Sequence, residues 1–165
     1  MKKKVFIILI TFVLLLVVWF LFFLFKQNDS SDEEPTLIES TYIVNDFEYA
    51  SVKIDTDTVM PNSVNVTFEY TGNYEANTGD WFTLEQEING KWYQIPKETI
   101  EGVNISFSLE AYPIERDQAL TKEYKWNMGY PSLSSGHYRI IVAIDERSIQ
   151  REYTKYYLAA EFNIE

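Results

Sequence analysis

The chain has 165 residues, a formal net charge of −11 and no cysteine. All 25 acidic residues follow Lys26, and four of the 14 basic residues precede Gln27, so the part from Gln27 onward carries 10 basic against 25 acidic residues. This charge argues against binding to nucleic acid or to anionic lipid. The absence of cysteine excludes disulfides, thiol catalysis, cysteine zinc sites and lipid attachment at an N-terminal cysteine.

Residues 5–25 form an apolar run in which Thr11 is the only polar side chain. A helix of this length reaches about 32 Å, which is enough to cross the hydrocarbon core of a bilayer. A cleaved signal peptide would have a shorter apolar stretch followed by small residues, and residues 22–27 (FFLFKQ) offer no such site. Three lysines at residues 2–4 predict a cytoplasmic N-terminus (residues 1–4) and a single-pass signal anchor at the cell membrane.

The part after the apolar run divides into a short linker and a longer domain. Residues 28–35 read NDSSDEEP, which is acidic and polar and has nothing to bury, so we expect a flexible stalk over residues 26–40. Residues 41–165 are expected to form one extracytoplasmic domain, which is long enough to stabilise itself by its own core.

The domain shows the alternation of apolar and polar residues that is typical of strands. Asn89-Gly90 separates two such stretches and is a strong signal for a tight hairpin, because both residues accept positive φ. The stretch around Tyr138–Ile144 is apolar on both faces, which predicts a central strand. We expect strands over residues 47–54, 64–70, 81–88, 91–95, 103–109, 121–128, 138–144 and 155–164, with loops or connections over 71–80, 113–120 and 146–153.

No helix of convincing period follows the anchor, and turn signals recur at short intervals. About seven or eight strands in this arrangement predict an all-β fold, an antiparallel sandwich of two sheets.

One stretch near the C-terminus carries a family resemblance. Leu133, Gly136 and Tyr138 reproduce the Leu-x-x-Gly-x-Tyr corner of immunoglobulin-like and fibronectin type III-like sandwiches, in which the tyrosine hydroxyl bonds back to the backbone. Together with the run LEQEINGKWYQIP (residues 84–96), the corner resembles a bacterial Ig-like domain family that occurs in Gram-positive envelope proteins. The resemblance covers residues 47–164 and implies a binding or accessory role, with no catalytic residue to carry over.

The sequence offers little for catalysis, a cofactor or a metal. His137 is the only histidine and lies at the corner, where a solvated side chain is more typical than a catalytic triad. Two acidic pairs, Asp55/Asp57 and Asp145/Glu146, could contribute to a calcium site, although acidic residues in turns usually serve the turn itself. We therefore expect a protein that is not an enzyme and uses no cofactor.

Two functions remain open. The first is a membrane-tethered Ig-like module that engages another envelope protein, and the second is a module that holds cell-wall glycan on exposed aromatic rings. Alternating aromatic residues are mostly strand formers that fill the core, so only some of the rings should be exposed. The rings expected at a partner or glycan surface are Trp81, Tyr74, Tyr130, Tyr153 and Tyr157.

Overall fold

The computed structural model describes residues 37–98, 107–147, 149–150 and 152–165, together with Leu16, Trp19 and Phe20. The chain divides into two compact units, residues 1–36 and 37–165. The predicted membrane helix lies outside the described residues except for Leu16, Trp19 and Phe20, which are helical and exposed. Within the described part of the chain, no helix has both the length and the apolar character needed to cross a membrane.

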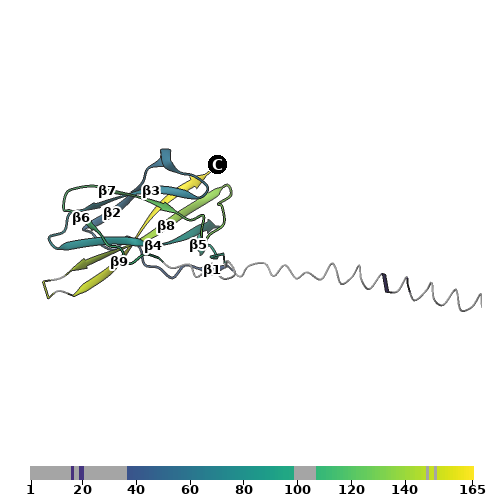
Figure 1. Cartoon of the computed structure of the whole chain (residues 1–165), viewed down its shortest axis with the longest axis horizontal. Coiled ribbons are helices and arrows are strands. Elements are labelled where there is room, and N and C mark those ends of the chain that lie inside the picture. The colour runs from purple at the N-terminus through teal and green to yellow at the C-terminus, as the bar shows by residue number, and fades with distance from the viewer. Residues whose placement is uncertain (1–15, 17–18, 21–36, 99–106, 148, 151) are drawn as a thin grey trace, which may run out of the picture. The chain divides into compact units, whose positions relative to one another are not determined.

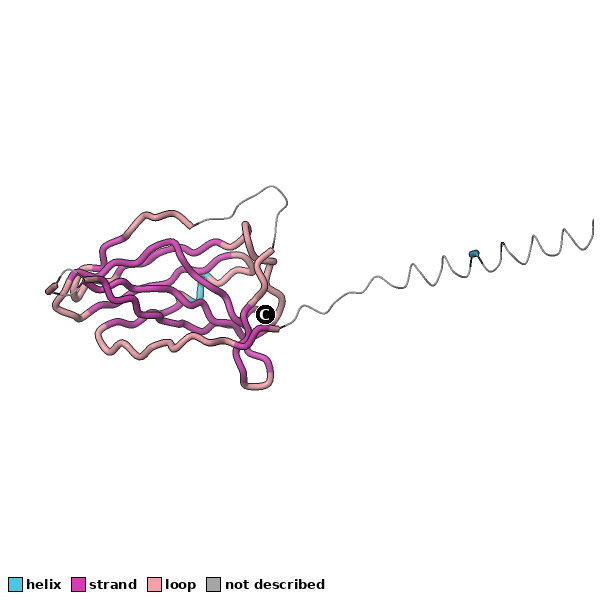
Figure 2. Tube along the Cα trace, turned by 90° about the horizontal axis from the view of Figure 1, so that it is seen from below, coloured by secondary structure: helices cyan, strands magenta, loops and turns pink. Residues whose placement is uncertain are grey.

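Residues 37–165 form two antiparallel sheets that face each other (Figure 1). The smaller sheet has the order β2-β3-β7, and the larger sheet has the order β1-β5-β4-β8-β9, with β6 also paired to β4. Figure 2 shows that strands run through most of this domain, with one short helical segment, η1, among its described residues. The elements are β1 (Ile38–Glu39), β2 (Ala50–Ile54), η1 (Thr56–Thr58), β3 (Ser63–Tyr70), β4 (Glu75–Ile88), β5 (Lys91–Gln94), β6 (Tyr112–Ile114), β7 (Leu120–Lys125), β8 (Gly136–Arg147) and β9 (Tyr153–Ile164).

The core lies between the sheets and is built from the alternate residues of each strand that point toward the other sheet. The pattern is clearest in β3, where buried and half-buried residues alternate from Ser63 to Tyr70. The predicted central strand is confirmed, because β8 pairs with β4 on one side and with β9 on the other. Its two apolar faces are both needed, since Ile140 packs in the core and Ile141 on the opposite face is equally buried.

Both local motifs form as the sequence predicts. The β4–β5 hairpin turns at Asn89 (φ 53°) and Gly90 (φ 78°), with Ile88 paired to Lys91. At the corner, the Tyr138 hydroxyl donates to the Ser134 carbonyl at 2.8 Å, and Leu133 is buried. The bond from Tyr138 ties the start of β8 to the corner.

Several element boundaries differ from the prediction. The expected loop over residues 71–80 is partly strand, because β4 begins at Glu75. The expected connection over 146–153 is also partly strand, because β8 extends to Arg147 and β9 begins at Tyr153. The expected connection at 113–120 contains β6, which pairs with the start of β4. β7 ends at Lys125 rather than at residue 128. Of the expected strand at 103–109, residues 103–106 lie outside the described part and the rest is not strand.

The long β4 strand contains one irregularity that matters for its neighbours. The register against β8 shifts between Thr78 and Phe82, which marks a β-bulge. Three residues, 79–81, lie within the bulge, and two of them point to different sides: Asp80 contacts Lys122 of the smaller sheet, whereas Trp81 packs with Tyr157 of β9.

The first residues of the domain form a strap, residues 37–46, across the outer face of the larger sheet. It pairs with β5 through β1, and Ser40 Oγ accepts a bond from Arg139 of β8 at 3.2 Å. At the far edge, the Asn45 amide clamps Ala159 of β9 with two bonds of 2.9 and 3.1 Å. The predicted stalk is therefore wrong at its end, because Ile38 and Glu39 already complete the edge of β5.

Candidate functional site

Four exposed apolar side chains gather at one end of the sandwich, which we call the tyrosine end: Tyr49, Tyr74, Ile149 and Tyr153. Their exposed fractions are 46%, 44%, 81% and 57%. They come from separate segments that the sheet register brings together. Glu75, which follows Tyr74, pairs with Arg147, and Arg147 pairs with Tyr153. Ala50, which follows Tyr49, pairs with Tyr70. Tyrosines with one apolar face and one polar tip are common at binding surfaces, so this end is a candidate for contact with a partner.

A buried tyrosine fixes the loop that presents Tyr74. Tyr70 is 1% exposed, and its hydroxyl donates to Glu146 Oε1 at 2.6 Å and accepts the Tyr74 N–H at 3.3 Å. Burial, and then the bond to Glu146, raise the pKa of Tyr70 to about 12. Gly72 lies directly against the ring, because a Cβ there would come within 2.2 Å of the Tyr70 hydroxyl. The loop is therefore held in one conformation by the ring beneath it.

The tyrosine end also carries charge. Arg147 Nη1 pairs with Glu75 Oε2 at 2.7 Å, and the same guanidinium lies 5.8 Å from the centre of the Tyr153 ring. The Glu48 carboxylate, followed by burial and by Glu146, raises the pKa of Tyr49. A hollow of about 500 Å³ next to Tyr74 is lined by Gly72–Asn77 and Pro113–Arg116.

A second aromatic group lies on the outer face of the larger sheet. The Trp81 and Tyr157 rings are 5.5 Å apart, and Tyr42 of the strap lies 6.0 Å from Trp81 and 5.0 Å from Tyr157. All three are half-buried, and burial, with Tyr157 and Glu85 nearby, raises the pKa of Tyr42. A hollow of about 510 Å³ adjoins Tyr42 and Tyr157. The strap thus covers much of the surface that Trp81 and Tyr157 would otherwise expose.

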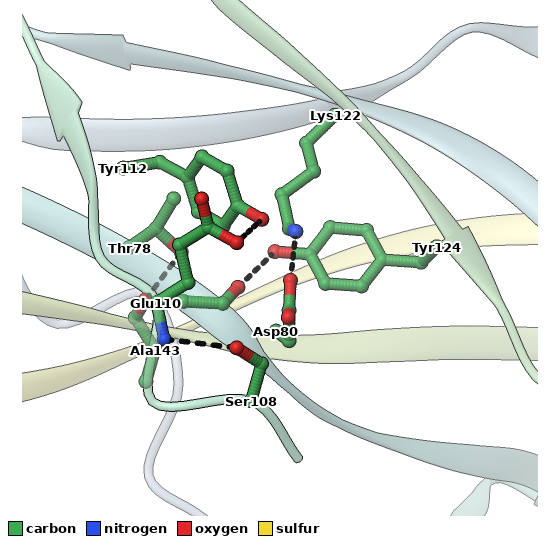
Figure 3. A network of polar contacts seen from close by, with 9 residues as sticks. Thr78, Asp80, Ser108, Glu110, Tyr112, Lys122, Tyr124 and Ala143 are labelled. Atoms are coloured by element: carbon green, nitrogen blue, oxygen red, sulfur yellow. Dashed lines mark hydrogen bonds and ion pairs between the residues drawn. The ribbon is translucent and has the colours of Figure 1, made fainter.

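A third hollow, of about 480 Å³, opens at the bulge between β4 and β7. Figure 3 shows its polar groups, which satisfy one another: Asp80 pairs with Lys122, and the Tyr124 hydroxyl donates to the Gly79 carbonyl at 3.2 Å. The Tyr112 hydroxyl similarly donates to Glu110 at 3.1 Å. Burial raises the pKa of Tyr124, so its hydroxyl stays protonated. The pair of Asp80 with Lys122 and the bond from Tyr124 to Gly79 join β4 of the larger sheet to β7 of the smaller sheet.

Asp55 and His137, which the sequence raised as candidates for chemistry, have contacts with neighbouring groups. Asp55 caps η1 by accepting the Asp57 N–H at 3.3 Å, which is the turn role expected for this pair. His137 lies between Glu87 (2.6 Å) and Glu161 (3.3 Å) on the outer face. Among the residues that the structure describes, no group of three or more histidine, aspartate or glutamate side chains is arranged to hold a metal ion.

The five rings predicted for a partner surface divide into three groups. Tyr74 and Tyr153 lie at the tyrosine end, and Trp81 and Tyr157 lie together under the strap. The prediction for Tyr130 is wrong: it is 3% exposed, its hydroxyl donates to Thr83 Oγ1 at 3.3 Å, and burial raises its pKa.

Sequence reasoning missed the exposure of Tyr49. The stretch at residues 47–54 breaks its alternation there, and this break was the available signal, because β2 begins only at Ala50.

The two-sheet fold, the tyrosine corner and the strand order define an immunoglobulin-like β-sandwich. A family model described as a bacterial Ig-like domain matches residues 46–163, so the chain belongs to this family. No curated protein and no solved structure matches the chain.

Proposed function

We propose that this protein is a membrane-tethered, extracytoplasmic module without catalytic activity that engages another envelope protein through the tyrosine end. Membership of the bacterial Ig-like family supports an extracellular accessory or binding role. The observation that carries the proposal is the gathering of exposed tyrosines from separate segments at one end, of which Tyr74 lies on a loop that Tyr70 and Gly72 hold in place.

The anchor in this proposal is the apolar run at residues 5–25, with the lysines at residues 2–4 on the cytoplasmic side. Residues 26–36 would connect it to the domain. Eleven residues span at most about 40 Å when fully extended, so the domain would stay close to the membrane surface. A partner would therefore be another protein at the same surface.

The attachment point supports this arrangement. The domain begins at β1, which pairs with the part of β5 that lies next to Glu85 of β4. The tyrosine end lies next to Glu75, at the other end of β4. Ten strand residues correspond to roughly 33 Å. Figure 1 shows β1 and the β8–β9 turn at opposite ends of the sandwich. Within the domain, the tyrosine end is therefore remote from the strand where the described domain begins.

Site-specific crosslinking in intact membranes tests the proposal. The full chain would carry a photoreactive residue in place of Tyr74 or Tyr153, and in place of Met128 as a control. Met128 is 71% exposed and follows the end of β7 that pairs with Ser63, at the opposite end of β3 from Tyr70. We expect the first two positions to crosslink to the same protein and Met128 not to do so. Crosslinking confined to Met128, or none at any position in membranes whose other complexes crosslink, would contradict the proposal.

Glycan binding is the second candidate, and the paired rings of Trp81 and Tyr157 favour it because sugars stack on aromatic faces. The hollow beside them also presents Lys155 and Asp46, which could bond to hydroxyl groups. Retention of the domain on purified cell-wall material, and loss of retention on Trp81→Ala, would support this function. Equal retention of both forms would count against it, because the pair of rings is its main basis.

A further inference from the structure

We infer that the tyrosine end binds a cationic side chain of the partner, an arginine or a lysine in an exposed segment. This inference rests on the proposed function and specifies the chemistry of the partner at the same surface. It follows from the distribution of charge, from one contact within the domain itself, and from the rigidity of the loop.

Negative charge dominates the tyrosine end. Glu48, Glu75 and Glu146 lie on or next to the segments that carry the exposed rings. Of the described cations near this end, Arg147 pairs with Glu75 and Arg116 pairs with Asp117 at 3.3 Å. A partner surface with positive charge would be attracted to this end, and a surface with negative charge would be repelled.

The domain itself shows how a cation is bound at this end. The guanidinium of Arg147 lies over the Tyr153 ring while it pairs with Glu75, so one ring and one carboxylate act together on one cation. The Tyr49 ring has similar surroundings, because Glu48 and Glu146 are near it. Tyr74 is linked to Glu146 through the Tyr70 hydroxyl, which bonds to the Tyr74 backbone and to the Glu146 carboxylate. Among the described residues, no lysine or arginine lies over the Tyr49 or Tyr74 ring, and both rings are exposed, so a cation of a partner could reach them.

The loop is ready for binding before a partner arrives. Tyr70 bonds to Glu146 and to the Tyr74 backbone, and Gly72 packs on the Tyr70 ring, so the loop does not need to be ordered on contact. Preorganised rings lose little conformational entropy on binding, which favours recognition of a single side chain.

The test uses the full chain in zwitterionic detergent and two fluorescent probes, a tetra-arginine peptide and a tetra-glutamate peptide, with affinity measured by anisotropy. The critical variant is Tyr49→Leu with Tyr74→Leu, which keeps the net charge and much of the apolar surface but removes both aromatic faces. Its matched control is Leu109→Ala with Met128→Ala, which also keeps the charge and changes two exposed side chains elsewhere. An exposed cation–π contact is worth a factor of roughly two to five in affinity.

We expect the arginine peptide to bind and the glutamate peptide not to bind. The tyrosine variant should weaken binding of the arginine peptide about tenfold, because it loses two such contacts, whereas the control variant loses none and should stay within about twofold. Equal weakening in both variants, or none in either, would overturn the inference, because the attraction would then be general to an acidic protein. Binding of the glutamate peptide would overturn it as well.

The two proposals can fail separately. If a partner crosslinks at Tyr74 but the arginine peptide shows no preference for intact rings, the cation site is refuted and the proposed function stands. If the peptide binds as expected but no protein crosslinks at Tyr74 or Tyr153, the cation site stands and the proposed function fails.

Discussion

Replacement of Gly72 by alanine should destabilise the domain through one contact, and the structure lets this contact be isolated. An alanine Cβ would lie 2.2 Å from the Tyr70 hydroxyl oxygen, 2.3 Å from Cζ and 2.6 Å from Cε2. Ordinary contacts of this kind are about 3.5–4.0 Å. The Tyr70 ring is 1% exposed and cannot move aside, so the loop must shift and lose the bond from the Tyr74 N–H.

Overpacking of this kind costs about 1–3 kcal/mol, and we expect Gly72→Ala to lie near the upper end, about 3 kcal/mol, because three ring atoms are involved. In a Tyr70→Leu background the same substitution should cost about 1 kcal/mol or less, since the ring atoms that it meets are gone. Urea unfolding of residues 37–165 for the two single variants and the double variant gives the coupling free energy directly.

Gly90→Ala is the matched control, because the two glycines differ in the reason for which they are needed. Gly90 has φ +78° and no atom within 4 Å of the position that a Cβ would take, so alanine there should cost about 1 kcal/mol of backbone strain in either background. Gly72→Ala costing the same amount with and without the Tyr70 ring would refute the reasoning, and the rigid display of Tyr74 would lose its explanation.

Three further results are expected. Asn45→Asp should speed hydrogen exchange at the Ala159 amide, because a carboxylate cannot donate to the Ala159 carbonyl; unchanged exchange would show that the clamp contributes little. Arg139→Met should cost about 3–5 kcal/mol in urea unfolding, since it leaves the fully buried Glu85 carboxylate without its partner, and adding Glu85→Leu should recover most of the loss. The free energy of unfolding should fall between pH 10 and 12, because Tyr70 ionises near 10 when unfolded and near 12 when folded, and Tyr70→Phe should reduce this fall. An identical pH dependence in Tyr70→Phe would mean that other tyrosines account for it.

Local motifs were predictable from the sequence because few residues decide them. Asn89 and Gly90 adopt positive φ without help from distant residues, and their turn fixes the β4–β5 register. Tyr138 reaches a carbonyl only four residues away. Alternation likewise predicted the central position of β8, since apolar residues on both faces require cover on both faces.

The candidate surface could not be predicted in the same way, because it depends on pairings between distant residues. Tyr130 looked like a surface ring, and its burial depends on Thr83, which lies 47 positions away. Tyr74 and Tyr153 resemble the other tyrosines in the sequence. They become neighbours only because Arg147 pairs with both Glu75 and Tyr153.

The strap shows why the end of the stalk was misplaced and why that matters for function. Residues 37–46 contain no alternation that would mark a strand, yet bonds at Ser40 and Asn45 fasten them to β8 and β9. They lie over the ion pair of Glu85 with Arg139, and both side chains are buried. On a sheet face open to water, this pair would be exposed. The strap is held at both edges of the larger sheet, at β5 through β1 and at β9 through Asn45. Its contacts shield the outer face, whereas Tyr74 and Tyr153 at the tyrosine end stay exposed.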